Sequence, residues 1–188
     1  MSNPREDILQ TTSSLMEKQG YHGTGLNEIV RESGAPKGSL YHYFPDGKEQ
    51  IASEAVLESG RLTAERIRAE LAAIADPATA VHDFVLAIAH HVEASRFAAG
   101  GPLTAVAMET ATKSERINAA CREAYADIET AFREKLLASG RSQAQAMGLA
   151  ICITAAIEGG ILLSRTFHSG DPLRAVATQL RALLSIGE

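Results

Sequence analysis

Aromatic residues are scarce in this chain of 188 residues, where they make up 5 %, and tryptophan is absent. Strand-like alternation of apolar and polar residues and internal repeats are also missing, so a β-rich or repeat architecture is not expected. Hydrophobic residues still make up 45 % and charged residues 22 %, which is typical of a folded globular protein. Because strong helix formers such as Ala, Leu, Glu and Arg are abundant, we predict an all-α fold.

Cysteine is almost absent, since the chain has only Cys121 and Cys152, which lie far apart and without metal-ligand spacing. Both lie in apolar helical patterns, so we expect two buried thiols that pack as small hydrophobic groups. A redox pair has no support in the sequence. The N-terminus lacks a basic and apolar leader, and we therefore expect the protein in the reducing cytoplasm.

Catalytic motifs are missing too, because the sequence contains neither a Gly-rich phosphate loop nor a nucleophile elbow. Glu109, His91 and Cys121 could be assembled into a hydrolase site, but nothing in their spacing requires it. We expect a protein that is not an enzyme and that carries no cofactor and no metal.

Positive charge is in short supply, with a net charge of −5 overall. Residues 1–75 alone contain eight Lys and Arg against eleven Asp and Glu. A basic surface is the usual sign of nucleic-acid binding. A nucleic-acid-binding protein of this composition must gather its few cations on one surface and use the dipoles of helix N-termini. Its affinity should then depend only moderately on salt.

The stretch from Thr24 to Phe44 predicts two short helices joined by a tight turn. The first helix carries three apolar residues at the i, i+3, i+4 spacing of one face: Leu26, Ile29 and Val30. Thr24 is placed to cap this helix, and Gly34 to end it in the left-handed conformation. Pro36 suits the first position of the second helix.

The second of these helices has an unusual composition, because only Leu40 and Phe44 form an apolar seam. Five hydrogen-bonding residues point elsewhere: Lys37, Ser39, Tyr41, His42 and Tyr43. A short helix with a small seam and many donors is suited to contact a partner. Helix, glycine-containing turn and donor-rich helix together predict a helix-turn-helix, whose second helix enters the DNA major groove.

The run GAPKGSLYHYF followed by Lys48-Glu49 resembles the signature of the TetR family of bacterial transcriptional repressors. The segment from Arg5 to Ile51 fits the DNA-binding domain of that family. The Pro-Asp-Gly before Lys48 and the later Gly100-Gly101-Pro102-Leu103 resemble the LmrA/YxaF-like branch. The resemblance implies a three-helix DNA-binding domain and a helical C-terminal domain that dimerises and binds a small molecule, which releases the DNA.

The resemblance also implies the DNA-binding residues, which are Thr24, Lys37, Gly38, Ser39, Tyr41, His42, Tyr43 and Lys48. Gly38 would let the helix backbone approach a base edge, and Lys37 can reach guanine acceptors. Hydroxyl and ring N–H donors suit phosphate, which Thr24 and Lys48 would also contact. In the commoner family ending the histidine directly precedes the phenylalanine, so which of His42 and Tyr43 meets phosphate stays open. One of Tyr41 and Tyr43 could instead pack in the core.

Caps and apolar spacing predict the helices of the body. A long helix over residues 48–74 would connect residues 1–47, the DNA-binding domain, to the rest of residues 48–188. Its inner face is predicted from four residues: Ile51, Ala55, Leu62 and Leu71. A further helix is expected over residues 77–97, where Asp76-Pro77 provides the cap and the first residue, and a last helix is expected from Asp171-Pro172 onwards. Residues 103–109 between them are a short apolar stretch. Capping boxes at Thr112–Glu115 and at Ser142–Gln145 predict the starts of two more.

Residues 146–163 are apolar nearly all round and are interrupted by Glu158. We reject a membrane span, because a carboxylate in mid-span is costly and no aromatic or basic belt flanks the run. Such a helix in a soluble protein is expected to be buried on every side. With the last helix it can form half of a four-helix bundle with a second copy. This homodimer would place its two N-terminal DNA-binding domains in successive major grooves of a near-palindromic operator.

Polar groups on apolar helices, together with adaptable apolar walls, are the candidates for a ligand pocket: His91, Phe97, Met108, Glu109, Tyr125 and Glu158. Glu109 and Glu158 stand out, because a buried charge needs a partner. For Glu158 the pocket, an ion pair with Arg165 and a contact across the dimer interface all stay open. The branch resemblance implies an aromatic natural product or antibiotic as ligand, and a nearby efflux or degradation gene.

The sequence therefore predicts a TetR-type repressor that a small-molecule ligand releases from its operator, and that has no membrane partner. The alternative is a metabolite-binding or redox-sensing helical protein whose N-terminal head contacts a protein partner.

Overall fold

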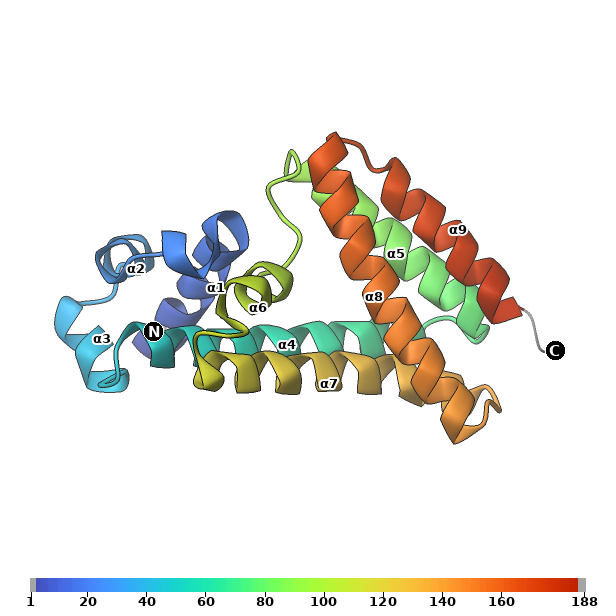
Figure 1. Cartoon of the computed structure of the whole chain (residues 1–188), viewed down its shortest axis with the longest axis horizontal. Helices are drawn as coiled ribbons and strands as arrows, with labels where there is room; N and C mark the ends of the chain where they lie inside the picture. The colour runs from blue at the N-terminus through green and yellow to red at the C-terminus, as the bar shows by residue number, and fades with distance from the viewer. Residues whose placement is uncertain (1–2, 186–188) are drawn as a thin grey trace. The chain divides into compact units, whose positions relative to one another are not determined.

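The computed structural model describes residues 3–185, and it confirms the all-α prediction, because this range forms helices and turns without a strand. The helices in chain order are α1 (Pro4–Gly23), α2 (Leu26–Ser33), α3 (Lys37–Tyr43), α4 (Lys48–Ala72), α5 (Pro77–Ala94), α6 (Leu103–Thr110), α7 (Glu115–Ala138), α8 (Gln143–Phe167) and α9 (Asp171–Ser185) (Figure 1).

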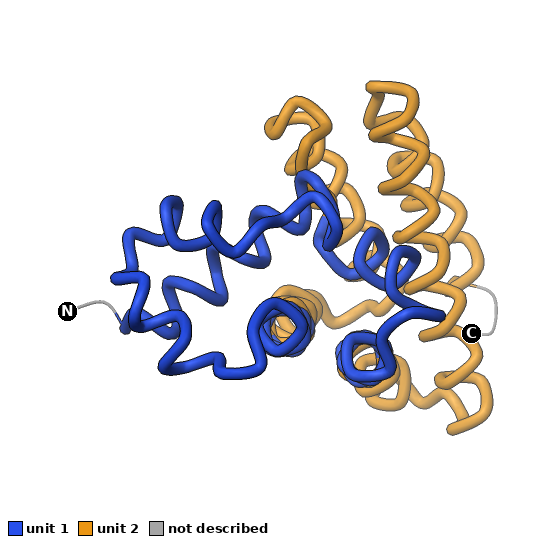
Figure 2. Tube along the Cα trace, turned by 60° about the vertical axis from the view of Figure 1, so that its left-hand side comes forward, with its two compact units in different colours: residues 1–61, 101–125 blue, residues 62–100, 126–188 orange. Residues whose placement is uncertain are grey.

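The chain forms two compact units (Figure 2). Unit 1 comprises Met1–Arg61 and Gly101–Tyr125, and unit 2 comprises Leu62–Gly100 and Ala126–Glu188. Helices α4 and α7 therefore each contribute residues to both units. The units do not follow the expected boundary between residues 47 and 48, because α6 and the first half of α7 cluster with the N-terminal helices. That boundary stays a prediction about which part binds DNA.

Unit 1 is built around α1, which packs against α2, α3 and α6. The larger side chains in its core include several that are at most 1 % exposed: Ile8, Met16, Ile29, Leu40, Phe44, Ile51, Val106 and Ile117. Each short helix contributes one or two of these residues, so none of the three N-terminal helices buries an apolar face without the others. The glycine prediction for the turn is confirmed, because Gly34 ends α2 with a left-handed φ of 66°.

Three of the predicted helix starts in unit 1 are shifted. Gly25, not Thr24, is the N-cap of α2, and it makes no side-chain cap hydrogen bond. Pro36 is the N-cap of α3 rather than its first residue. Helix α7 begins at Glu115, and the hydroxyl of Ser114 accepts from Ile117 N at 3.1 Å. The capping residue is therefore Ser114, two residues after the predicted Thr112. A sequence pattern predicts that a helix begins nearby, but it fixes the first residue only to within one or two positions.

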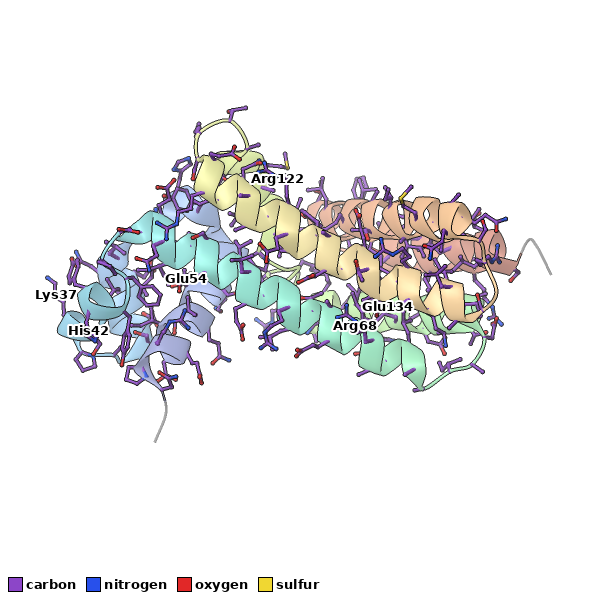
Figure 3. All side chains as sticks on the ribbon, turned by 90° about the horizontal axis from the view of Figure 1, so that it is seen from below. Lys37, His42, Glu54, Arg68, Arg122 and Glu134 are labelled. Atoms are coloured by element: carbon purple, nitrogen blue, oxygen red, sulfur yellow. The ribbon has the colours of Figure 1, made fainter. Side chains whose placement is uncertain are left out.

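Unit 2 packs α5 against α9 and α8, and α8 against α9. The rings of Phe84 and Phe132 meet edge to face, with centroids 5.9 Å apart. Gly160 allows the close approach of α8 and α9, because a Cβ there would lie 2.8 Å from Leu173 Cδ2. Arg68 on α4 and Glu134 on α7 form an ion pair at 2.8 Å on the surface of this unit (Figure 3). Leu62 is 51 % exposed, so its predicted place on the inner face of α4 is wrong.

Helix α8 begins as predicted, with both hydrogen bonds of the capping box between Ser142 and Gln145. It is not buried on every side, however, and this corrects the sequence-based expectation. One face packs inward, while the other leaves six apolar or weakly polar side chains exposed: Met147, Ile151, Cys152, Leu162, Leu163 and Phe167. By length and composition alone α8 could cross a membrane, but a single helix of this kind is weak evidence for a span, and Glu158 lies within it.

The two thiols differ in their surroundings. Cys121 is buried as expected, and burial raises the pKa of its thiol, so it stays protonated and unreactive near neutral pH. Cys152 is exposed on α8, which corrects the prediction that both thiols are buried. Sequence hydrophobicity could not separate them, since both lie in apolar helical runs.

Asp76 caps α5 as predicted, because its carboxylate accepts from Thr79 N at 2.8 Å and Thr79 Oγ1 at 2.6 Å. The hydroxyl of Thr79 and then the backbone amides lower the pKa of Asp76 below its ordinary 3.8. A depressed folded-state pKa stabilises the fold above the ordinary value, and this contribution is lost as the pH falls through the lowered pKa. We expect Asp76→Ala to cost about 1 kcal/mol of unfolding free energy near neutral pH.

Urea denaturation of the wild type and of Asp76→Ala, at pH about 7 and about 3, checks this prediction. The stability difference should shrink toward acid, where the carboxyl group becomes protonated. A difference that grows as the pH falls would contradict the assigned role of the charged carboxylate.

Candidate nucleic-acid interface

Helix α3 presents its hydrogen-bonding side chains outward from unit 1. Leu40 and Phe44 are fully buried, as the seam predicted, and they anchor the helix to α1 and the core. Lys37, Gly38, Tyr41 and His42 are exposed, while Ser39 and Tyr43 are half-buried. Figure 3 shows Lys37 and His42 on the outer side of α3, away from the helices that pack behind it. This surface offers an ammonium, an imidazole and a phenol on one short helix.

The two tyrosines of α3 have different roles. Tyr41 is 51 % exposed. The ring of Tyr43 makes edge contacts with the rings of His42 and Phe44, with centroid distances of 5.1 Å and 6.4 Å. Tyr43 is therefore the partly packed member of the pair, and Tyr41 is the one that extends freely into solvent.

Carboxylates accompany the basic side chains around α3. Arg5 on α1 pairs with Glu54 at 2.5 Å. The guanidinium of Arg31 on α2 lies 3.0 Å from Glu32 and 3.7 Å from Glu28. Lys37 differs, because no ion pair within residues 3–185 involves it. The positive charge on the outer face of α3 therefore comes from Lys37.

Lys48 is held at the start of α4 by an aromatic ring. Its Nζ lies 4.3 Å from the centroid of the Tyr21 ring, a favourable cation–π geometry. Partial burial lowers the pKa of Lys48, and the charge of Glu109 opposes this shift. Burial and then the charge of Glu49 raise the pKa of Tyr21. The ammonium of Lys48 is thus fixed against the end of α1 rather than extended into solvent.

Thr24 requires a correction. Its side chain is 1 % exposed, and its hydroxyl donates to the carbonyl oxygen of Gly20 at 2.8 Å. The hydroxyl therefore stabilises the turn between α1 and α2, and in this geometry it is not free to contact phosphate. The sequence pattern placed a hydroxyl correctly near the start of α2, but it could not show which carbonyl group the hydroxyl would meet.

The six ligand-pocket candidates do not gather in one unit. Met108, Glu109 and Tyr125 belong to unit 1, while His91, Phe97 and Glu158 belong to unit 2. Met108 is 76 % exposed, and its place in a pocket wall stays a prediction. His91 is also exposed, whereas Glu158 is half-buried on α8. The hydroxyl of Tyr125 lies 3.2 Å from Thr104 Oγ1 on α6.

The carboxylate of Glu109 forms a hydrogen bond with the backbone of the N-terminal helices. Its Oε2 accepts from the backbone N–H of His22 at 2.8 Å. The sequence indicated that this carboxylate needs a partner, but the partner is 87 residues away in the chain and only the fold brings it close. Glu109 therefore lies at the junction of α1 and α2.

Phe97 lies in a constrained turn at the end of α5. Arg96 and Phe97 both have positive φ angles, of 54° and 64°, which is costly for residues with a side chain. The guanidinium of Arg165 donates to the Phe97 carbonyl at 3.2 Å, and the Phe97 ring lies 5.4 Å from that of His168. Backbone and side-chain contacts therefore both fix the position of Phe97.

Comparison with known proteins agrees with this architecture. Residues 8–55 match the family model for bacterial regulatory proteins of the tetR family. Residues 77–179 match the model for the C-terminal domain of LmrA/YxaF-like transcriptional regulators. The HTH-type transcriptional regulators YxaF and LmrA of Bacillus subtilis are each 41 % identical to this chain over 180 residues. The alignments cover 96 % of this chain, 94 % of YxaF and 96 % of LmrA.

Solved structures share the fold over nearly the whole chain. The reduced form of NemR from Escherichia coli has a TM-score of 0.86 and 18 % identity, and the match covers 99 % of this chain and 100 % of NemR. A cysteine mutant of CifR, solved with operator DNA, has a TM-score of 0.77 and 18 % identity, with 94 % of both chains covered. The N-terminal and C-terminal family models, together with relatives of 41 % identity over almost the full length, show that the chain belongs to the TetR family of bacterial transcriptional regulators, with an LmrA/YxaF-like C-terminal domain.

Proposed function

We propose that this transcriptional regulator is a homodimeric repressor that binds a near-palindromic operator through α3 and leaves it when a small molecule binds. The observation that carries the proposal is the outward set of donors on α3, held in place by the buried Leu40 and Phe44. Residues 1–47 would form the DNA-binding domain and residues 48–188 the ligand-binding and dimerisation domain. The protein would act in the cytoplasm, without enzymatic activity.

The positions on α3 divide the proposed DNA contacts between bases and phosphates. Lys37 is exposed without an ion pair in the described chain, so it can reach guanine acceptors. Gly38 is exposed and has open space around it, which lets the helix backbone approach a base edge. Tyr41, His42 and Ser39 offer donors that suit phosphate oxygens. Because the nearby arginines already pair with carboxylates, the salt dependence of binding should be moderate.

Lys37→Ala and Tyr41→Ala are expected to weaken binding to the DNA upstream of the protein's own gene by at least about tenfold each. A base contact by Lys37 is worth about 1–3 kcal/mol, and a hydrogen bond from Tyr41 to a charged phosphate is worth about 1.5–3 kcal/mol. Both side chains are exposed, so folding should be unaffected. A mobility-shift titration measures the change, and circular dichroism checks the fold.

Arg181→Ala is the matched control, because it removes one exposed cation from α9 in unit 2, whereas α3 belongs to unit 1. It should bind like the wild type. Tyr41→Phe keeps the ring and removes only the hydroxyl, so it separates phosphate hydrogen bonding from ring contact. Unchanged binding in both alanine variants would contradict the assignment of α3 as the DNA-reading helix.

The homodimer is proposed from the exposed apolar face of α8. Met147, Ile151 and Leu162 recur at nearly helical spacing along one side of the helix and are 54 %, 49 % and 54 % exposed. On α9, Leu183 is also 38 % exposed. A soluble protein rarely leaves such a face open to water. A second copy of the chain, related by a two-fold axis, would cover this face with the same face of its own.

The effector is proposed to be an aromatic natural product or antibiotic bound by the C-terminal domain. Three of the candidates from the sequence, His91, Phe97 and Glu158, all belong to unit 2 and remain candidates for its recognition. The ligand must bind more tightly to the conformation that does not bind DNA. A ligand with equal affinity for this conformation and the DNA-binding one would leave the equilibrium between them unchanged. Operator DNA should then weaken ligand binding by the same factor as ligand weakens operator binding. Thermal-shift screening of aromatic compounds, followed by titration with and without DNA, tests this reciprocity.

A further inference from the structure

Two carboxylates link α1 and α6 in a reciprocal way within unit 1. Glu109 on α6 accepts from the backbone N–H of His22, near the end of α1, at 2.8 Å. Glu17 on α1 accepts from the backbone N–H of Gly101, just before α6, at 2.7 Å. A carboxylate of α6 therefore holds the backbone near the end of α1, and a carboxylate of α1 holds the backbone just before α6. Both are charge-assisted hydrogen bonds, which are stronger than neutral ones.

The contact of Glu109 falls at a break in α1. Gly20 has φ 73° and ψ 179°, a conformation that only glycine adopts readily, and it separates residues 21–23 from the helix before them. A Cβ at Gly20 would collide with Oε1 of Glu109. Gly20 is thus needed both for the backbone conformation and for the space that the carboxylate occupies.

Because α1 is interrupted at Gly20, backbone N–H and C=O groups near the interruption cannot form the usual i to i+4 helical hydrogen bonds and need other partners. The hydroxyl of Thr24 donates to the Gly20 carbonyl at 2.8 Å, and Thr24 N donates to the Tyr21 carbonyl at 3.3 Å. The N–H of His22 donates to Glu109. These three hydrogen bonds set the direction in which the chain leaves α1 and enters α2, and α2 is joined to α3 by only three residues.

The charge of Glu109 also acts on Lys48, whose ammonium lies against the ring of Tyr21. One carboxylate therefore acts on the last turn of α1 through His22 and on the first residue of α4 through Lys48. These two segments flank α2 and α3 in the chain. A displacement of Glu109 would remove a hydrogen bond on one side of the helix-turn-helix and a favourable charge on the other.

We infer that Glu109 is a positioning residue for DNA binding, which holds the junction of α1 and α2 so that α3 is presented in its binding orientation. This inference rests on the proposed function of α3. Glu109 itself does not contact DNA, and it acts through the backbone of His22. Glu17, which fixes the chain before α6, keeps α6 in the place from which Glu109 reaches that backbone.

The test compares Glu109→Ala and Glu109→Gln with the wild type, in hydrogen exchange at the His22 amide and in operator binding. Glu123→Gln is the matched control, because it removes one exposed carboxylate from the same unit. A hydrogen bond to a charged acceptor is worth about tenfold to a hundredfold in an equilibrium constant. We expect Glu109→Ala to speed exchange at His22 and to weaken operator binding by about that factor.

Glu109→Gln keeps the size of the side chain and an acceptor oxygen, so it should fold even where the alanine variant does not. It is expected to lie between the wild type and Glu109→Ala in both measurements, with a melting temperature close to that of Glu123→Gln. A general loss of stability would instead lower the melting temperature and speed exchange throughout unit 1.

Operator binding by Glu109→Gln and Glu109→Ala within about twofold of Glu123→Gln would overturn the inference, provided that Lys37→Ala weakens binding in the same assay. Unchanged exchange at His22 would overturn it as well, since the hydrogen bond would then have no role in solution. If Lys37→Ala and Tyr41→Ala also bind normally, the proposed function of α3 fails, and the role of Glu109 fails with it.

Discussion

Replacing Ile151 and Leu162 with glutamate is expected to convert the proposed homodimer into a monomer and to weaken operator binding at least about a hundredfold. The two side chains are 49 % and 54 % exposed on the outer face of α8, so the substitutions should not destabilise the protomer. In a two-fold interface each substitution occurs twice, and four carboxylates would be buried without partners. Sedimentation velocity measures the association state, and a mobility-shift titration measures DNA binding.

Ala119→Glu and Ala126→Glu together are the control for this variant. They add the same two charges at exposed positions of α7, outside the apolar face of α8. The control should remain a dimer and should bind the operator like the wild type. If the α8 variant stays a dimer at micromolar concentration, the interface must use another surface, and the exposed apolar face of α8 needs another explanation.

The loss of DNA binding in the α8 variant follows from geometry rather than from any change in α3. A two-fold dimer places two recognition helices on half-sites about one helical turn of DNA apart. Once the first DNA-binding domain is bound to its half-site, the second is held at a high effective concentration near the other half-site. The dimer therefore binds the operator far more tightly than a single DNA-binding domain does. A monomer keeps its contacts with one half-site and loses this gain. Binding to a single half-site should therefore change little between the variant and the wild type.

The fold could be predicted from the sequence where local chemistry decides it. Asp76 and Ser142 fixed two helix starts, because their side chains reach amides only two or three residues away. Gly34 fixed the turn of the helix-turn-helix for a similar local reason. Thr24 shows the limit, because its hydroxyl had two suitable partners within four residues, and packing chose the Gly20 carbonyl. Local patterns predict that an element exists more reliably than they predict its terminal residue.

The site could be predicted only in part, for a related reason. The outward face of α3 followed from the sequence, because Leu40 and Phe44 are the only apolar pair at helical spacing in that segment. The role of Glu109 did not, since its partner His22 is 87 residues away. The exposure of Ile151 could not be predicted either, because hydrophobicity shows that a side chain avoids water but not whether its own chain covers it.

Phe44→Ala is expected to destabilise unit 1 by about 3–5 kcal/mol and to abolish operator binding, although Phe44 makes no proposed contact with DNA. The side chain is fully buried, its ring meets that of Tyr43 edge to face, and the guanidinium of Arg5 lies 5.8 Å from its centroid. Removing the ring leaves a cavity beneath α3, and the helix has only Leu40 as its other buried anchor. Urea denaturation measures the loss of stability, and hydrogen exchange in α3 shows where it occurs.

Tyr41→Ala is the informative comparison, because it also removes an aromatic ring from α3, but one that is 51 % exposed. Its unfolding free energy should change by less than about 1 kcal/mol, while its operator binding falls. Phe44→Ala should instead lose stability and binding together, and a stabilising osmolyte should partly restore its binding. If Tyr41→Ala were the more destabilised of the two, the ring of Tyr41 would be a core residue, and the outward face of α3 could not be the surface that reads DNA.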